Sequence, residues 1–534
     1  MKSRTFHTIE YSAFKAVLTC ILTVYCIEAN GQYKGNDPQR ADAKIALKKS
    51  VSWSSILADD NTGLKHIGNI TAPEKGTDKY DFWSIGCETM DRDYSFLPSY
   101  KQYLSELGAG YGRLMSGWAK TEKVKGQYNF EWLDEHVDGL AEEGVKPWMC
   151  LCYGNELYSG TGTLLFSQII TGEETLAAWE RYVEALVQRY KGRIHMYEIW
   201  NEPNYGGIYK TPGLKEVTYS RYAELVYRTL RAIRKYDKKV AIAAGSLASY
   251  LDFDFCMSFL DFLKERGLQK EVDYITFHPY GSIPERRLDE IVDLQKSLKQ
   301  SVPWISLLQG EVGIRGLFDT FGQDLKNNEF AQDKWVLRQM AMEFGLGIPC
   351  SIFSMIDNKY PHKLQSYGML AADLQGRSLY KRPQFYGYQN MVSVLDKEVK
   401  AGPALDVDID AEKQLYHISI TGKGKIKGIM LWFGNEKPGN SSIKDRVGVK
   451  VAGLKLKNPV YADMITGRVF ELADFQVTSE GMEFHNLPLW DAPVLIMEAN
   501  AFRWTSVAPE KSFKKAAPKT AAPVKKVTPI CPGK

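Results

Sequence analysis

Two glutamates stand where apolar, strand-like runs of the sequence end. Glu202 follows the run 194–200, and Glu311 follows the run 304–310. Pro203 has no N–H and restricts the residue before it to extended geometry, so a strand cannot continue through it. The turn therefore holds Glu202 at the carboxyl end of its strand, where parallel α/β folds and barrels keep their chemistry. We interpret Glu202 as a catalytic acid and Glu311 as the second carboxylate.

A pair of carboxylates on two different strands fits the chemistry of glycoside hydrolysis. One carboxyl group protonates the leaving oxygen, and the other attacks the anomeric carbon or activates water. This division of labour explains why both Glu202 and Glu311 have to be acids.

The elements that must position these glutamates alternate regularly along the chain. Eight short apolar runs predict strands at 82–86, 112–116, 146–152, 194–200, 240–244, 274–277, 304–310 and 348–355. Amphipathic segments between them predict helices at 130–143, 173–190, 219–235, 255–265, 288–298 and 331–344. Eight βα alternations predict a (β/α)₈ TIM barrel over residues 79–400. A doubly wound sheet is disfavoured because no GxGxxG loop follows the first strand.

A second, smaller domain is expected after the barrel, since the 534 residues suffice for both. Short strands with turn signals between 401 and 500 predict a β-sandwich, for which a scaffold role is favoured over carbohydrate binding. The polar, Lys-rich stretch 32–78 leaves two alternatives open. It is a lead-in to the barrel, or it lends a strand to the β-domain.

The two ends of the sequence read as a targeting segment and a solvated tail. An apolar run at 16–27 behind basic residues predicts a signal peptide over residues 1–31, and hence a secreted or periplasmic protein; an uncleaved anchor is the alternative. Residues 501–534 are rich in Lys, Ala and Pro and predict disorder. The net charge of +4 comes from this tail, so nucleic-acid binding is disfavoured, while attachment to an anionic surface stays open.

Metal and disulfide chemistry find little support. The eight histidines are scattered, without an HxH or HExxH motif, so we expect no metal and no cofactor. Cys87, Cys150 and Cys350 lie in apolar runs and are expected to be buried free thiols.

The motif Trp200-Asn201-Glu202-Pro203 resembles the fourth-strand motif of the retaining glycoside hydrolases of clan A. The resemblance covers roughly residues 80–395 and is most like family 39, whose members include β-xylosidases. The resemblance implies that Glu202 is the acid/base, Asn201 binds the sugar 2-hydroxyl, and Glu311 is the nucleophile. It also makes Arg113 the arginine beneath the nucleophile, where its charge would favour an ionised Glu311.

Further residues near strand ends are candidates for substrate binding: Trp118, Tyr153, Asn155, His278 and Tyr280. The segment 274–281 resembles the clan's sixth-strand motif, in which a histidine or aromatic residue orients the nucleophile or contacts the sugar. The eighth strand departs from the family, because residues 351–358 lack the tryptophan that many members place under the sugar. The identity of the sugar therefore does not follow from the resemblance.

The sequence thus predicts a retaining β-glycosidase that acts on an oligo- or polysaccharide by double displacement. Two alternatives use the same features differently. One is a non-catalytic polysaccharide-binding barrel, which needs aromatic residues but not both acids. The other is a transglycosylase that uses the same residues. The oligomeric state and the choice between internal and terminal cleavage stay open.

Overall fold

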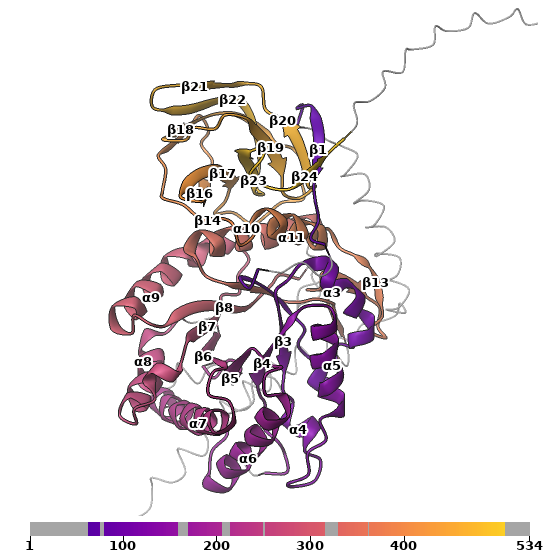
Figure 1. The fold of residues 1–534 in the computed structure, drawn as a ribbon, viewed down its shortest axis with the longest axis vertical. Coiled ribbons are helices and arrows are strands. Elements are labelled where there is room, and N and C mark those ends of the chain that lie inside the picture. The colour runs from indigo at the N-terminus through magenta and orange to yellow at the C-terminus, as the bar shows by residue number, and fades with distance from the viewer. Residues whose placement is uncertain are drawn as a thin grey trace, which may run out of the picture.

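Eight parallel strands close into a barrel that forms the centre of the larger domain (Figure 1). The computed structural model describes residues 62–74, 80–158, 169–204, 214–248, 251–315, 329–360 and 363–507. The barrel strands follow one another in chain order: β2 (Trp83–Gly86), β3 (Tyr111–Met115), β4 (Lys146–Leu151), β5 (Met196–Ile199), β6 (Ala241–Ala248), β7 (Tyr274–His278), β8 (Ser306–Val312) and β9 (Cys350–Ile352). The predicted barrel is confirmed, with all eight strands at the expected places.

Helices surround the barrel, as Figure 1 shows for α5 to α9. The α-helices are α3 (Lys101–Leu107), α4 (Trp118–Thr121), α5 (Glu131–Glu142), α6 (Glu173–Tyr190), α7 (Leu214–Tyr236), α8 (Phe253–Lys264), α9 (Leu288–Ser301), α10 (Glu329–Leu346) and α11 (Pro383–Val394). In α6 the buried side chains recur every three or four residues, and acidic residues begin the helix while Arg189 lies in its last turn. Asp252 caps α8 by accepting a hydrogen bond from the Phe255 N–H at 3.0 Å.

Two antiparallel sheets make the C-terminal domain that lies above the barrel in Figure 1, as predicted. The larger sheet has the strand order β14 (Lys400–Ala401), β16 (Leu415–Gly422), β17 (Lys425–Phe433), β23 (Val494–Glu498), β19 (Pro459–Asp463), β20 (Arg468–Glu471), β1 (His66–Ile70) and β24 (Trp504–Ser506). The smaller sheet has the order β15 (Val407–Ile409), β18 (Asp445–Ala452), β22 (Gly481–Leu489) and β21 (Phe475–Val477).

The segment before the barrel belongs to this second domain. Strand β1 pairs with β20 on one side and with β24 on the other. The larger sheet therefore combines β1, which precedes the barrel in the sequence, with strands that follow the barrel. Its last strand extends past residue 500 as far as Ser506. The predicted signal peptide at 1–31 and most of the predicted tail lie outside the described residues.

Helix α10 lies between the barrel and the β-domain, and its side chains are buried on every side from Glu329 to Phe344. Arg338 donates a hydrogen bond from Nε to Glu285 at 2.8 Å, and the Trp432 indole of the β-domain donates to the same carboxylate at 2.8 Å. Lys334 donates to the Ser441 carbonyl at 2.7 Å. These buried polar contacts fix how the β-domain sits on the barrel.

Two short hairpins follow the last barrel strand. They are β10 (Asn358–Tyr360) with β11 (Lys363–Gln365), and β12 (Leu370–Ala372) with β13 (Ser378–Lys381). Arg382 lies behind them and donates to Asp357 at 2.7 Å, which ties the hairpins to the start of α11.

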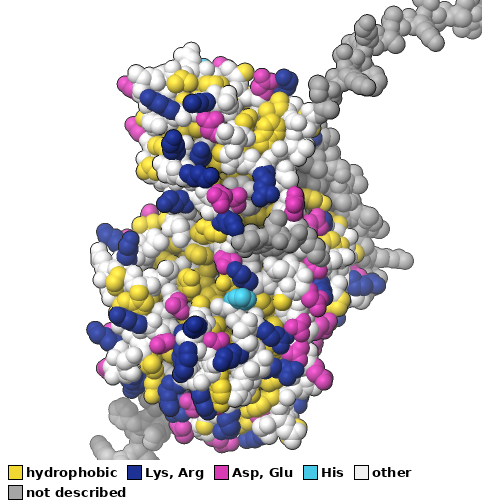
Figure 2. Space-filling view, viewed as in Figure 1, with side chains coloured by type: hydrophobic (Ala, Val, Ile, Leu, Met, Phe, Trp, Pro, Cys, Tyr) yellow, Lys and Arg dark blue, Asp and Glu magenta, His cyan; other side chains and the backbone are white. Residues whose placement is uncertain are grey.

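Cys87, Cys150, Cys152, Cys256 and Cys350 are all buried and free, in agreement with the thiols expected from the sequence. In the part of the chain that the structure describes, no helix has both the length and the apolar character needed to cross a bilayer. On the face drawn in Figure 2, basic and acidic side chains are interspersed over both domains.

Candidate active site

Glu202 lies just beyond the carboxyl end of β5, in a turn with unusual backbone geometry. Trp200 has a φ of 67° and Glu202 a φ of 51°, both in the left-handed region. The extended geometry expected for Glu202 before Pro203 is therefore wrong. The Glu202 N–H donates to the Ser246 carbonyl at the end of β6 at 3.1 Å, and this bond fixes the sharper turn. Non-glycine residues with positive φ are uncommon and cluster at functional sites.

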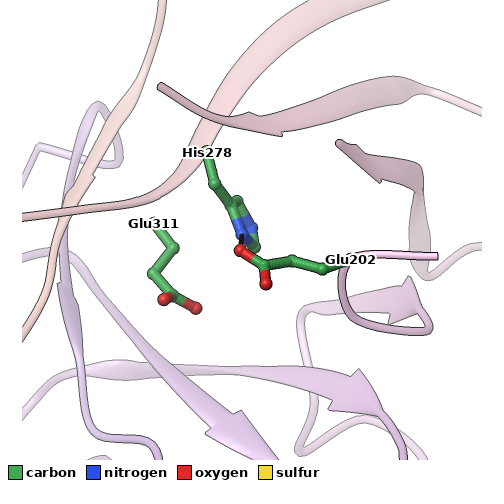
Figure 3. A group of neighbouring side chains, drawn as sticks. All are labelled: Glu202, His278 and Glu311. Carbon is green, nitrogen blue, oxygen red and sulfur yellow. Dashed lines mark hydrogen bonds and ion pairs between the residues drawn. The ribbon is translucent and has the colours of Figure 1, made fainter. Parts of the chain in front are cut away.

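Glu311 lies in β8, directly opposite Glu202 (Figure 3). A carboxylate oxygen of Glu202, a carboxylate oxygen of Glu311 and a ring nitrogen of His278 all lie within 4.8 Å of one another. The side chains of Glu202 and Glu311 are 10% and 13% exposed, so both are largely withdrawn from water and yet accessible at one edge. Two carboxylates thus face each other across a small gap.

Arg113, from β3, is the hub of the polar network below this gap. Its Nη1 donates to Glu311 Oε2 at 2.8 Å, and its Nη2 donates to Asn201 Oδ1 at 2.8 Å. Nε donates to Glu198 at 2.7 Å and Nη1 also donates to Glu88 at 2.8 Å. The guanidinium is completely buried, and its four hydrogen bonds fix the positions of all four partners.

The nucleophile predicted at Glu311 is held in its ionised form. Burial alone would raise its pKa, but the charges of His278 and Arg113 and the hydrogen bonds from Tyr280 and Arg113 keep the pKa of Glu311 below its ordinary value. The Tyr280 hydroxyl donates to Glu311 Oε1 at 2.8 Å. Both oxygens of Glu311 therefore accept a hydrogen bond, as a carboxylate anion requires.

The pKa of Glu202, the predicted acid, is shifted in the opposite direction to that of Glu311. Burial raises the pKa of Glu202, and the negative charge of Glu311 adds to this rise although the hydrogen bond with His278 opposes it. Burial lowers the pKa of His278, but the charges of Glu311 and Glu202 outweigh it and leave the pKa raised. The His278 Nδ1 and Glu202 Oε1 are 2.9 Å apart, which is within hydrogen-bond distance, so the ionisation of one group affects the other.

Asn201 and Tyr153 form the wall next to Glu202. Asn201 Nδ2 donates to the Tyr153 hydroxyl at 2.9 Å, while its Oδ1 accepts from Arg113. Seven of the nine predicted site residues therefore belong to this network: Arg113, Tyr153, Asn201, Glu202, His278, Tyr280 and Glu311.

Trp118 and Asn155 lie away from the network. Trp118 is completely buried, and its ring stacks on Tyr158 and Tyr182 at centroid distances of 5.2 and 5.7 Å. Asn155 donates to the Glu122 carbonyl at 2.9 Å. Both residues line a cavity of about 450 Å³ that borders Tyr153, so they support a neighbouring surface and not the carboxylate pair itself.

Several residues of the site were not predicted from the sequence. Glu88 follows β2 by two residues, and Glu198 lies within β5; both bind Arg113. Tyr367 hydrogen-bonds Arg315 at 3.1 Å and stands against Tyr280, with centroids 6.2 Å apart. Phe353 comes directly after β9, and its ring packs against Tyr367 at 5.2 Å. A strand-end signal was available for Glu88 and Phe353, but none for Tyr367.

Glu202, His278 and Glu311 are also the one group among the described residues with ligand atoms close enough for a metal ion. Each oxygen of Glu311 already accepts a hydrogen bond, and His278 is bonded to Glu202. A cation there would have to break these bonds and sit beside the charge of Arg113. The donor set therefore suits a carboxylate pair better than a metal.

Comparison with known proteins finds similarity to glycoside hydrolases. Residues 111–302 match the model of glycosyl hydrolases family 39. A beta-xylosidase of Geobacillus stearothermophilus is 26% identical over 169 residues, which cover 30% of this chain and 32% of that protein. The chain thus matches about a third of the length of this relative.

Two solved structures are similar to this chain, and the first of them shows the same fold. A family 39 glycoside hydrolase from the gut symbiont Bacteroides cellulosilyticus WH2 matches with a TM-score of 0.57 at 16% identity, over 80% of this chain and 83% of that one. A monomeric beta-xylosidase from Caulobacter crescentus CB15 matches with a TM-score of 0.49 at 16% identity, over 81% of this chain and 98% of that one.

A closed (β/α)₈ barrel with two opposed glutamates at its strand ends, together with these matches, makes the chain similar to the clan A glycoside hydrolases. Within that class, the part of the chain that matches a family model, residues 111–302, is similar to glycosyl hydrolases family 39.

Proposed function

We propose that this chain is a retaining β-glycosidase, with Glu311 as nucleophile and Glu202 as acid/base. The observation that carries the proposal is the approach of the two carboxylates to within 4.8 Å, combined with a lowered pKa for Glu311 and a raised pKa for Glu202. Retaining enzymes hold their carboxyl groups about 5–5.5 Å apart, whereas inverting enzymes leave about 6.5–9.5 Å for a water molecule.

The reaction takes two steps. Ionised Glu311 attacks the anomeric carbon while protonated Glu202 gives its proton to the leaving oxygen, which forms a glycosyl ester. Glu202, now ionised, removes a proton from a water molecule that attacks the same carbon and releases Glu311. His278 hydrogen-bonds Glu202 throughout, and Arg113 with Tyr280 stabilises Glu311 before attack and after release.

The substrate we propose is a neutral β-linked oligo- or polysaccharide. Tyr153, Tyr280 and Tyr367 supply rings and hydroxyls near the carboxylates, which suits the C–H faces and hydroxyls of a sugar. Because the relative from Geobacillus stearothermophilus is named a beta-xylosidase, aryl β-xylosides are the first substrates to try. The apolar segment at 16–27 behind basic residues supports our proposal that the protein is exported.

A panel of aryl β-glycosides and polysaccharides tests the proposal, with NMR detection of the anomer first released. The wild type should release the β-anomer, and Glu202→Ala and Glu311→Ala should lose turnover. Glu265→Ala is the matched control, because this glutamate is 76% exposed at the end of α8. Turnover that survives in Glu311→Ala, or release of the α-anomer, would contradict the mechanism.

Azide separates the two roles. In Glu202→Ala, azide attacks the glycosyl ester and should give a glycosyl azide of the substrate's own configuration. In Glu311→Ala, azide attacks the substrate directly and should give the opposite configuration. Polysaccharide binding without any turnover would point to a non-catalytic binding barrel instead, and transfer to added sugars in place of hydrolysis would point to a transglycosylase.

A further inference from the structure

Glu88 is a buried carboxylate at the active site that the two-step reaction does not use. It follows β2 and is 1% exposed. Its Oε1 accepts a hydrogen bond from Arg113 Nη1, the same nitrogen that binds Glu311. Its Oε2 points toward Gly86, where a β-carbon would come within 2.2 Å of that oxygen. Glycine at this position therefore leaves the space that the carboxyl group of Glu88 fills.

Arg113 is surrounded by more negative charge than it can balance. Glu88, Glu198 and Glu311 all accept hydrogen bonds from its one guanidinium, and the guanidinium, Glu88 and Glu198 are completely buried. Buried charges are tolerated only when they are paired and hydrogen-bonded. Three anions around one guanidinium would leave a net charge of −2 on these four groups, and His278 lies next to Glu311 and not next to Glu88 in the hydrogen-bond network, so a proton on one of the three carboxyl groups is favoured.

Hydrogen bonding indicates which of the three carries the proton. Glu198 accepts on both oxygens, from Arg113 at 2.7 Å and from the Thr276 hydroxyl at 2.7 Å. Glu311 also accepts on both oxygens, from Arg113 and Tyr280. Glu88 Oε2 has no hydrogen-bond partner among the described residues. Because hydrogen bonds to a carboxylate favour its charged form, Glu88 is the group least stabilised as an anion.

We propose that Glu88 is a positioning residue for the nucleophile. Glu88 carries a proton while Glu311 is ionised, so the positive charge of Arg113 is shared by Glu198 and Glu311 alone. The inference rests on the role proposed for Glu311. When Glu88 loses its proton, a second anion shares Arg113 Nη1 with the nucleophile and competes for it.

The surroundings of Glu88 agree with this assignment. Burial raises the pKa of Glu88 to about 7, and the charge of Glu311 adds to the rise while Arg113 opposes it. The other titratable neighbours are the Cys87 thiol and the Tyr100 phenol, whose pKa values burial raises well above the ordinary range, so both stay neutral. The charges that face Glu88 thus come from Arg113 on β3 and Glu311 on β8.

Glu88→Gln tests the proposal, since glutamine keeps the shape of a protonated glutamate and can accept the Arg113 bond but cannot ionise. The measurement is the pH profile of kcat/KM from pH 4 to 9. The acidic limb, set by Glu311, should keep its position to within about 0.2 pH unit, because Glu88 is already neutral where Glu311 titrates. An ionisation near pH 7 in the wild type should be missing from the variant.

The opposite charge state predicts a different profile. If Glu88 were ionised at all pH values, glutamine would remove a like charge next to Glu311 and move the acidic limb down by roughly one pH unit. That shift would overturn the proposal.

Infrared difference spectra between pH 5.5 and 8.5 detect the protonation of Glu88 directly and do not require a substrate. The wild type should lose a protonated-carboxyl band that is missing from the Glu88→Gln difference spectrum and present in that of Glu265→Gln, the exposed control. A band retained in Glu88→Gln would refute the assignment even if hydrolysis follows the proposed mechanism. Conversely, if no hydrolysis is observed, the infrared spectrum still shows whether Glu88 is protonated.

Discussion

Arg113 Nη1 and Glu311 Oε2 lie 2.8 Å apart, and the guanidinium is fully buried while the carboxylate is 13% exposed. The cation therefore holds the proposed nucleophile from below and leaves one edge of the carboxylate exposed. Glu198 and Asn201 fix the other nitrogens of Arg113, so the position of Glu311 depends on a fork of hydrogen bonds and not on charge alone.

Arg113→Lys should therefore impair catalysis even though the charge is kept. Lysine has three donors on a flexible stem and cannot bond Glu88, Glu198, Glu311 and Asn201 together. We expect kcat to fall by about 10²–10³-fold, the size seen when one preorganised electrostatic contact is lost. Steady-state kinetics checks this, with Arg193→Lys as the control at an exposed ion pair with Asp138. Near wild-type kcat in Arg113→Lys would show that charge alone suffices.

Tyr280→Phe should move the acidic limb of the pH profile upward. The Tyr280 hydroxyl donates to Glu311 Oε1 and lowers its pKa, so loss of the donor raises that pKa. A hydrogen bond to a charged group contributes about 1.5–3 kcal/mol, which corresponds to roughly 1–2 pH units. Activity should therefore be lost at a higher pH on acidification, as kcat/KM against pH would record. Tyr227→Phe, on the outer helix α7, is the control, and an unmoved limb would contradict the role of Tyr280.

Much of the barrel could be predicted because its signals are local. The apolar run at 146–152 and the 3-to-4 spacing within 173–190 require only neighbouring residues, and the structure has β4 at Lys146–Leu151 and α6 at Glu173–Tyr190. The rule that strand ends carry the chemistry also sufficed to bring Glu202 and Glu311 into one candidate site, although they are far apart in the chain. Arg113 lies inside β3 and was predicted through the resemblance to clan A.

The remaining features depend on contacts that no local pattern encodes. Asp333, Lys334 and Arg338 look like the solvated face of a helix, yet they are buried because the β-domain covers α10. Glu88 looks like a loop residue until Arg113 is seen to bind it. The left-handed turn at Glu202 depends on the bond from its N–H to Ser246 on the next strand, which the sequence around Pro203 does not reveal.

Trp118 lies near a strand end and was predicted to bind substrate, yet its contacts indicate a structural role. Because its ring is buried against Tyr158 and Tyr182, Trp118→Ala should reduce the free energy of unfolding by about 3–5 kcal/mol through the cavity it leaves. Trp118→Phe should lose less stability and leave KM unchanged. Denaturant unfolding and steady-state kinetics of both variants check this, with Tyr153→Phe for comparison at the Asn201 bond. A KM raised severalfold in Trp118→Phe would mean that the ring contacts the sugar.

Glu343 gives the protein a stability that depends on pH. It is buried in α10, where Oε1 accepts from Gln339 at 2.8 Å and Oε2 has no partner among the described residues. Burial raises its pKa from 4.5 to about 8. Between these values the folded state binds more protons than the unfolded state, so the free energy of unfolding falls as the pH rises. The stability that protonated Glu343 contributes is fully present below pH 4.5 and is lost as the pH passes about 8.

Glu343→Gln should remove this dependence, because the amide stays neutral at every pH. One group contributes up to about 1.4 kcal/mol per pH unit, so the difference in unfolding free energy between pH 5 and pH 8 should shrink by up to about 4 kcal/mol in the variant. Urea unfolding at both pH values measures it, with Glu290→Gln as the control on α9, where the side chain is 56% exposed. Burial also raises the pKa of Asp333. Because Asp333 is present in the wild type and in both variants, it contributes equally to the pH dependence of the unfolding free energy in all three. A variant that loses stability between pH 5 and pH 8 as steeply as the wild type would show that Glu343 is already ionised at pH 5, and that the fold tolerates an unpaired charge inside α10.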